Sequence, residues 1–278
     1  MQQAGELLLK WVNAQNLKGA TTKLYQDQGK TPLLYAEVEG HPNYNKSIVL
    51  YGHFDKQPHG KGWDEEYGPL SGKIKDGKLY GRGSSDDGYA TFASILLIKA
   101  LQQFNIPHPK FIMFIEADEE TDSADLPYYF KKFEDRIGEP EIIACLDSGC
   151  GNYEQLWMTN SLRGVMNVNL RVDVIEQGKH SGDVGGMVPS SFRILRSLLE
   201  RFENANTGDM ADFFKVSIPP IRYQELHQVS QVLGEHYHEE CKFVEGTQPV
   251  CNSTFENFLN RTWRPAVNYI GIDGVPSC

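Results

Sequence analysis

The sequence passes abruptly from apolar to polar residues in the stretch Ile48-Val49-Leu50-Tyr51-Gly52-His53-Phe54-Asp55. An apolar run with polar ends predicts a buried β-strand, and a spacing of two places His53 and Asp55 on the same face of its extended end. A metal-bound imidazole usually donates its second N–H to a carboxylate or carbonyl. His53 and Asp55 are therefore a candidate metal ligand and its orienting partner, although a lone pair of this kind is more often found in a turn or at a surface.

Acidic residues follow two further apolar stretches that also predict buried strands. Residues 110–117 lead into Asp118-Glu119-Glu120, and residues 141–146 lead into Asp147. Adjacent glutamates point in different directions, so one of Glu119 and Glu120 can bind a metal ion while the other acts as a general base. The alternative is that these acids only favour the N-terminus of a helix that begins after residue 123.

A glycine-rich segment, residues 81–88, precedes a predicted helix over residues 89–103. It lacks the third glycine of a dinucleotide fingerprint and the Lys-Ser/Thr of a P-loop, and it carries Asp86 and Asp87 where an anion would approach. A cation therefore fits this segment better than a phosphate. The alternative is that one of the two aspartates only caps the helix.

The alternation of strands and helices predicts an α/β fold with a mostly parallel sheet and helices on both faces. Such sheets bind ligands outside the carboxyl ends of their strands, so the acids after each strand and His53 are expected at one edge. The remaining elements predicted before residue 147 are a helix over 6–17, a strand over 33–38 and a hairpin over 73–80, whose turn is Asp76-Gly77.

The pattern changes beyond Asp147. Residues 156–159 and 164–174 alternate apolar and polar side chains, which predicts antiparallel strands with one wet face, and a domain boundary is expected near 160–164. His180 lies in a glycine-rich loop, residues 178–186. Further predictions here are helices over 189–202 and 223–238 and a strand over 266–272.

Composition excludes several functional classes for the 278-residue chain. Its net charge of −10 and the lack of clustered Lys and Arg argue against nucleic-acid binding. No apolar run is long enough to span a membrane, and the first residues do not have the layout of a signal peptide. The five cysteines show no Cys-x-x-Cys spacing, which favours reduced thiols and a cytoplasmic location, with Cys145 expected in the core.

Six ordered motifs carry a family resemblance. They are residues 51–58 (YGHFDKQP), 62–64 (GWD), 79–87 (LYGRGSSDD), 116–120 (EADEE), 146–147 (LD) and 178–182 (GKHSG). In order and spacing they resemble the dinuclear zinc peptidases that include carnosinase, cytosolic dipeptidases, aminoacylase and succinyl-diaminopimelate desuccinylase. The carnosinase and dipeptidase branch is the most similar.

This resemblance implies a role for each matching residue. His53, Asp86 and Asp147 are expected to bind one zinc ion, with Asp86 bridging to a second zinc ion that Glu120 also binds. Asp55 is expected to orient His53, and Glu119 to act as the general base. His180 matches a lid histidine that, in dimeric members, reaches the active site of the partner. Manganese or cobalt could replace zinc in such a mixed set of ligands.

The resemblance also implies an architecture and a substrate class. Residues 1–160 would form the N-terminal part of a catalytic metal-binding domain, and residues 161–278 part of a smaller α+β lid that makes a homodimer. The expected activity is hydrolysis of an amide bond in a small peptide or N-acyl amino acid.

The chain also departs from the family pattern. Family members are longer and take their last metal ligand, a histidine, from beyond the lid, so the chain reads as truncated and is expected to bind at most one zinc ion tightly. Gly88 replaces a usual Lys, and Asp122 a usual Gly. The alternative functions are a catalytically inactive homologue that serves as a binding or dimerisation module and, least favoured, a nucleotide-binding domain built on residues 81–85.

Overall fold

The computed structural model describes residues 1–234 and 241–274. The chain forms two compact units, Met1–Met158 and Thr159–Cys278. The assignment of these regions to a catalytic domain and a lid stays a prediction. None of the described helices is long and apolar enough to cross a membrane.

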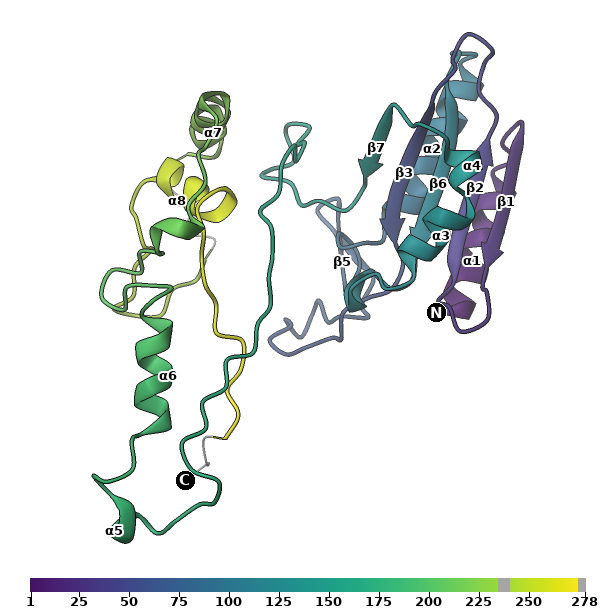
Figure 1. Cartoon of the computed structure of the whole chain (residues 1–278). Coiled ribbons are helices and arrows are strands. Elements are labelled where there is room, and N and C mark those ends of the chain that lie inside the picture. Colours follow the sequence, from purple (N-terminus) through teal and green to yellow (C-terminus); the bar gives the residue numbers. More distant parts are fainter. Residues whose placement is uncertain (235–240, 275–278) are drawn as a thin grey trace. The chain divides into compact units, whose positions relative to one another are not determined.

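The first unit contains a five-stranded sheet with the order β1-β2-β6-β3-β7 (Figure 1). Its strands are β1 (Ala20–Tyr25), β2 (Leu33–Val38), β3 (Ser47–His53), β6 (Lys110–Glu116) and β7 (Ile142–Cys145). β3 pairs in parallel with β6 and β7, while β2 pairs antiparallel with β1 and β6. Only β2 therefore runs against the others, and the predicted mostly parallel α/β fold is confirmed.

Helices cover both faces of this sheet (Figure 1). On one face α1 (Gln2–Ala14) and α2 (Ala90–Gln103) pack through Val12 and Ile95 against side chains of β2 and β6. On the other face α3 (Leu126–Lys132) and α4 (Glu134–Ile137) pack through Tyr129 and Ile137. Alternating strand residues supply the two cores because successive side chains point to opposite faces.

The register of the strands brings their carboxyl ends to one edge. His53 is paired with Glu116 of β6, and Tyr51 is paired with Cys145 of β7. The N–H of Leu146 donates to the carbonyl of Tyr51 at 2.8 Å, which extends the alignment as far as the residue before Asp147. Each of the three predicted strands therefore delivers its polar residues to the same place.

Most elements predicted in this unit are present. The helix predicted over 6–17 begins at Gln2 and ends at Ala14. The hairpin consists of β4 (Lys73–Lys75) and β5 (Lys78–Tyr80), and its turn residues Asp76 and Gly77 have φ angles of 50° and 75°. Positive φ at both positions is the geometry that an Asp-Gly turn favours.

Two expectations about the sheet need correction. β1 was not predicted, because its sequence alternates half-buried and exposed side chains and includes two threonines and a lysine. The strand over 141–146 is predicted to be buried, but β7 is an edge strand whose residues Ile142 and Ile143 are each 53% exposed, and Cys145 is exposed rather than in the core.

The regular elements in the described part of the second unit are helices, and most of its described residues lie outside them. It contains α5 (Ser181–Val184), α6 (Ser191–Leu199), α7 (Pro220–Leu233) and α8 (Thr254–Thr262), with a short 3-10 turn η2 (Asp212–Phe214). The predicted helix 189–202 corresponds to α6. The predicted helix 223–238 corresponds to α7, and its residues 235–238 lie outside the described residues.

The strands predicted over 156–159, 164–174 and 266–272 are wrong, because these residues form neither helix nor strand. Among the described residues of this unit, strand-type pairing is confined to the bridge between Glu203 and Met210. Alternating apolar and polar residues indicate only that an extended segment would have one solvent-exposed face. A β-strand also needs a neighbouring strand to which it is hydrogen-bonded.

Candidate metal centre

His53 ends β3 and is the buried centre of a polar cluster, with 1% of its surface exposed. Its Nδ1 lies 3.2 Å from Oδ1 of Asp55 and 3.1 Å from the carbonyl oxygen of the same residue. These contacts fix the ring orientation and leave Nε2 free to face other groups. Asp55, itself 6% exposed, therefore holds His53 as the spacing of two predicts.

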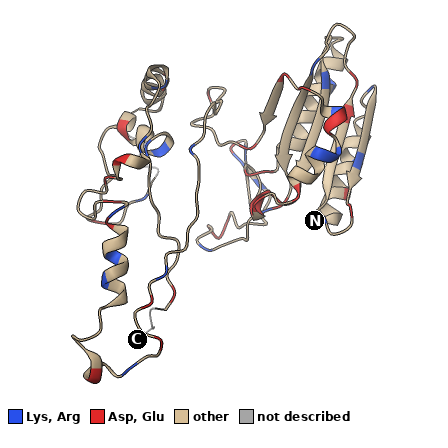
Figure 2. Cartoon of the chain, viewed as in Figure 1, with Lys and Arg blue, Asp and Glu red and all other residues tan. Residues whose placement is uncertain are grey.

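Carboxylates from three different segments surround Nε2 of His53. The nearest oxygens belong to Asp86 at 3.2 Å, Asp147 at 3.5 Å and Glu119 at 3.8 Å. Ligand atoms of His53, Asp86 and Glu120 all lie within 4.8 Å of one another, and so do those of His53, Glu119 and Asp147. Figure 2 shows acidic segments in the loops beside the arrowheads of the sheet, whereas the strands are mostly uncharged.

Asp55 also positions the two glutamates. Its carboxylate accepts hydrogen bonds from the backbone N–H groups of Glu119 at 3.3 Å and Glu120 at 2.9 Å. The 3-10 turn η1 (Glu119–Thr121) that carries them ends at Asp122, which has a left-handed φ of 77°. Aspartate tolerates this conformation better than most residues, which explains how it can replace the usual glycine.

The two aspartates before α2 have separate roles. Asp87 is fully buried, and its Oδ1 accepts from the N–H groups of Tyr89 and Ala90 at 3.1 Å each while its Oδ2 accepts from the N–H of His53 at 3.0 Å. It therefore joins the start of α2 to the end of β3. Asp86 is more exposed and faces Nε2 of His53. Asp87 thus makes the contacts of the helix-cap alternative, and Asp86 stays the candidate ligand.

Glycines allow these segments to approach closely. A Cβ atom on Gly52 would lie 2.3 Å from Cβ of Ala90 and 2.4 Å from Oδ2 of Asp87. A Cβ atom on Gly88 would lie 2.0 Å from the carbonyl oxygen of Gly83. A lysine at position 88 would therefore not fit this turn as it is folded here.

The charges of the cluster shift the pKa values of its members. Burial opposes the charged form of His53, but its hydrogen bond to the Asp55 carboxylate and the charge of Asp147 raise its pKa to about 9. Burial raises the pKa of Glu119 and of Asp147, and neighbouring carboxylates add to the rise although His53 lowers both. The cluster therefore carries more negative charge than its own groups neutralise, as expected of a cation site.

The donor set fits a metal ion by chemistry and by distance. Zinc accepts histidine nitrogen and carboxylate oxygen at about 2.0–2.2 Å, so two of its ligands lie no more than ~4.4 Å apart. The separations of 3.2, 3.5 and 3.8 Å from Nε2 of His53 are within that limit. The residues of the cluster could therefore hold a metal ion after small side-chain movements.

Two neighbours of Asp55 also reach the cluster, although neither of them is assigned a role from the sequence alone. Gln57 donates from Nε2 to Oε2 of Glu120 at 2.7 Å. Lys56 donates from Nζ to the carbonyl oxygens of Asp55, at 2.8 Å, and Asp87. The signals in the sequence are that both residues directly follow the His-x-Asp pair and lie in the motif of residues 51–58.

His180 lies in the second unit, apart in sequence from the other candidates. It precedes α5 and accepts a hydrogen bond at Nδ1 from the N–H of Gly182 at 3.1 Å. The predicted contact of His180 with a second copy of the chain stays a prediction.

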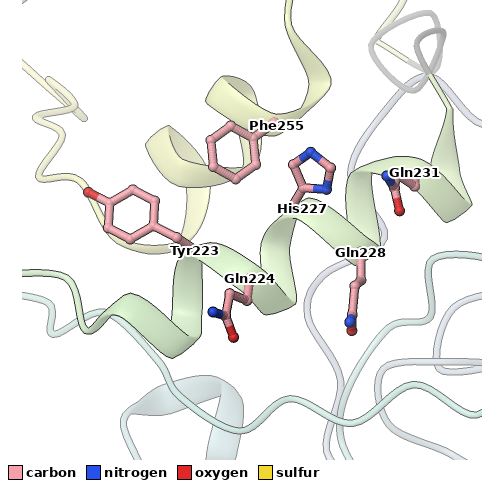
Figure 3. Close-up of a pocket in the computed structure, with 6 residues that line it drawn as sticks. All are labelled: Tyr223, Gln224, His227, Gln228, Gln231 and Phe255. Atoms are coloured by element: carbon pink, nitrogen blue, oxygen red, sulfur yellow. The ribbon is translucent and has the colours of Figure 1, made fainter.

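The second unit also has a pocket between α7 and α8 (Figure 3). Phe255 lies between Tyr223 and His227, with ring centroids 6.4 and 5.9 Å away. The pocket is also lined by the side-chain amides of Gln224, Gln228 and Gln231. A single imidazole without a carboxylate is a poor metal site, so the chemistry of this pocket differs from that at His53.

Comparison with known proteins identifies the family of the chain. Residues 49–265 match the model of peptidase family M20/M25/M40. The chain belongs to this family. The match includes each candidate metal ligand in the first unit as well as His180.

Several curated relatives of this M20 chain are named dipeptidases. It is 27% identical over 248 residues to the Beta-Ala-His dipeptidase of Homo sapiens, covering 87% of this chain and 48% of the relative. It is 26% identical over 259 residues to a Cys-Gly metallodipeptidase of Schizosaccharomyces pombe, covering 90% and 52%. The chain thus spans about half the length of these relatives.

Solved structures agree on the fold. An M20 family metallo-carboxypeptidase from Sulfolobus solfataricus superimposes with a TM-score of 0.62 at 18% identity, covering 100% of this chain and 62% of the other. At this identity the likeness supports the fold only.

Proposed function

We propose that the chain carries the metal centre of a zinc-dependent peptidase that hydrolyses amide bonds in small peptides, such as dipeptides, or in N-acyl amino acids. The observation that carries this proposal is the buried His53, oriented by Asp55, with carboxylates of Asp86, Glu119, Glu120 and Asp147 around its free nitrogen. Family membership and the dipeptidase names of the relatives support the reaction class.

In this proposal His53, Asp86 and Asp147 bind one zinc ion, and Asp86 and Glu120 contribute to a second. A bound zinc ion supplies a Lewis acid that polarises the substrate carbonyl and lowers the pKa of water. The structure also allows Glu119 in the first set of ligands, because its carboxylate lies close to both His53 and Asp147. Manganese or cobalt remains an alternative to zinc for this donor set.

Glu119 is proposed as the general base. It accepts the proton of the water that attacks the amide carbon and then passes this proton to the leaving amine. Burial first, and the charges of Asp147 and Glu120 next, raise the pKa of its carboxyl group, whereas His53 lowers it. A raised pKa makes a carboxylate a better proton acceptor near neutral pH.

The finer assignments remain part of the proposal. A cytoplasmic location is supported by four free cysteines among the described residues. The homodimer, the lid role of residues 161–278 and the contribution of His180 rest on the family resemblance.

The test is hydrolysis of a dipeptide panel by the purified chain with added zinc, manganese or cobalt. We expect turnover, and we expect Glu119→Gln to lower kcat by about 10²–10⁴-fold while zinc binding is retained. Gln57→Ala, which removes only a contact to Glu120, serves as a milder comparison. A folded, zinc-loaded chain without any turnover would contradict the catalytic proposal and favour the binding-module alternative.

A further inference from the structure

Lys56 makes contacts that the proposed chemistry does not require. Its ammonium group donates to the carbonyl oxygens of Asp55, at 2.8 Å, and Asp87. Asp55 holds His53 and the two glutamates, while Asp87 holds the start of α2 and the backbone of His53. A single side chain therefore joins the two residues that position the candidate ligands.

The aliphatic part of Lys56 is tightly enclosed by the glycine-rich segment. A Cβ atom on Gly83 would lie 2.2 Å from Cε and 2.6 Å from Cδ of Lys56, and Gly83 has a φ of +82°. Gly88 in turn lies against Gly83, since its Cβ atom would lie 2.0 Å from the carbonyl oxygen of Gly83. The segment thus folds against the lysine at Gly83, whose positive φ favours glycine, and Gly88 leaves no space for a Cβ atom beside the Gly83 carbonyl.

The charge of Lys56 alone would work against a bound cation. Positive charge near a metal ion weakens binding, whereas residues that orient its ligands strengthen it. The contacts of Lys56 are with main-chain carbonyls rather than with the carboxylate oxygens of the candidate ligands. This geometry favours an orienting effect over a charge effect.

We propose that Lys56 is a positioning residue that fastens residues 81–88 to the end of β3, and so keeps Asp86 where it can share a metal ion with His53. The inference rests on the proposed metal centre and adds Lys56 to the residues that position its ligands.

The test measures the zinc affinity of the metal-free, full 278-residue chain by competition with a chromophoric chelator. Lys56→Met keeps the length of the side chain and removes its ammonium group. We expect zinc affinity to fall by about tenfold or more, the usual effect of losing a group that orients metal ligands. An unchanged affinity, or the rise expected from removing a positive charge, would overturn the proposal.

A second variant approaches the same contact from the glycine side. Gly83→Ala should also weaken zinc binding, because its methyl group would displace the lysine. Gly77→Ala is the matched control, since Gly77 has a similar φ of +75° but open space around its Cβ position. Should Lys56→Met fail to fold, equal zinc affinities for Gly83→Ala and Gly77→Ala would overturn the proposal by themselves.

A double-mutant cycle links the two variants. If Lys56 and Gly83 act through one contact, combining Lys56→Met with Gly83→Ala should cost less affinity than the sum of the single losses. Fully additive losses would contradict a shared contact.

His53→Ala separates this inference from the proposed function. Normal zinc binding by His53→Ala would refute the metal centre itself. Loss of binding in His53→Ala together with normal binding in Lys56→Met would refute only the role of Lys56.

Discussion

Among the histidines that the structure describes, His53 is set apart by its carboxylate neighbours. Its position and its pairing with Asp55 follow directly from an apolar run that ends in His-x-Asp. The same sequence pattern assigns no part to Lys56 or Gln57, because their contacts are made with residues that are distant along the chain. Local spacing predicts a ligand and its partner, but it does not predict what a loop folds against.

Proton competition at His53 should make zinc binding dependent on pH. With a pKa of about 9 in the metal-free protein, the imidazole is protonated at neutral pH, so zinc must displace that proton. Apparent zinc affinity should therefore rise by up to about tenfold per pH unit from pH 7 and level off above about pH 9. Chelator competition measured across this range checks the slope, and a flat profile between pH 7 and 8.5 would show that His53 is not the displaced group.

Asp55→Asn removes the charge that holds His53 and weakens the anchor of Glu119 and Glu120. We expect zinc affinity to fall by about 10–100-fold, since neutral asparagine neither stabilises the ring in the same way nor accepts the two N–H groups equally well. Asp76→Asn in the exposed β4–β5 turn is the control, because asparagine suits a positive φ. Similar zinc affinities for the two variants would argue against the orienting role.

The elements of the first unit were predictable to different degrees. β2 and β6 are buried on both faces and strongly apolar, so their bounds follow closely from the sequence. β1 escapes prediction because it is half exposed and polar. The alternation over residues 164–174 resembles a strand, yet the described residues offer it no hydrogen-bonded neighbour.

The start of α2 separates a structural acid from a candidate ligand. Asp87→Ala should lower the free energy of unfolding by about 1–3 kcal/mol, because it leaves three backbone N–H groups without their buried acceptor. Asp86→Ala should leave the stability of the metal-free protein within about 0.5 kcal/mol of wild type and weaken zinc binding instead. Urea unfolding in the presence of a chelator, together with zinc titrations, distinguishes the two variants. Equal losses of stability in Asp87→Ala and Asp86→Ala would contradict the separate roles of the two aspartates.

At the scale of the whole molecule, residues 1–158 contain the sheet, all three apolar cores that pack on it and every candidate ligand near His53. The fold of this unit and its ligand cluster follow from sequence because each strand end carries its own signal. The second unit was less predictable, because the sequences of its glycine-rich loop and of its alternating segments do not indicate which other segments they pack against.

A fragment of residues 1–158 should therefore fold and bind zinc with an affinity within about threefold of that of the full chain. Cooperative thermal unfolding and chelator competition would check this. A fragment that folds cooperatively but does not bind zinc would show that residues beyond 158 supply a ligand.

We propose above that the edge of the sheet around His53 is a zinc site. Its most direct test is the zinc content of the full chain and of His53→Ala after dialysis against a low micromolar concentration of zinc. We predict one tightly bound zinc ion per wild-type chain and little or none in His53→Ala. A wild-type chain that retains no zinc, or a variant that retains as much as the wild type, would contradict the account.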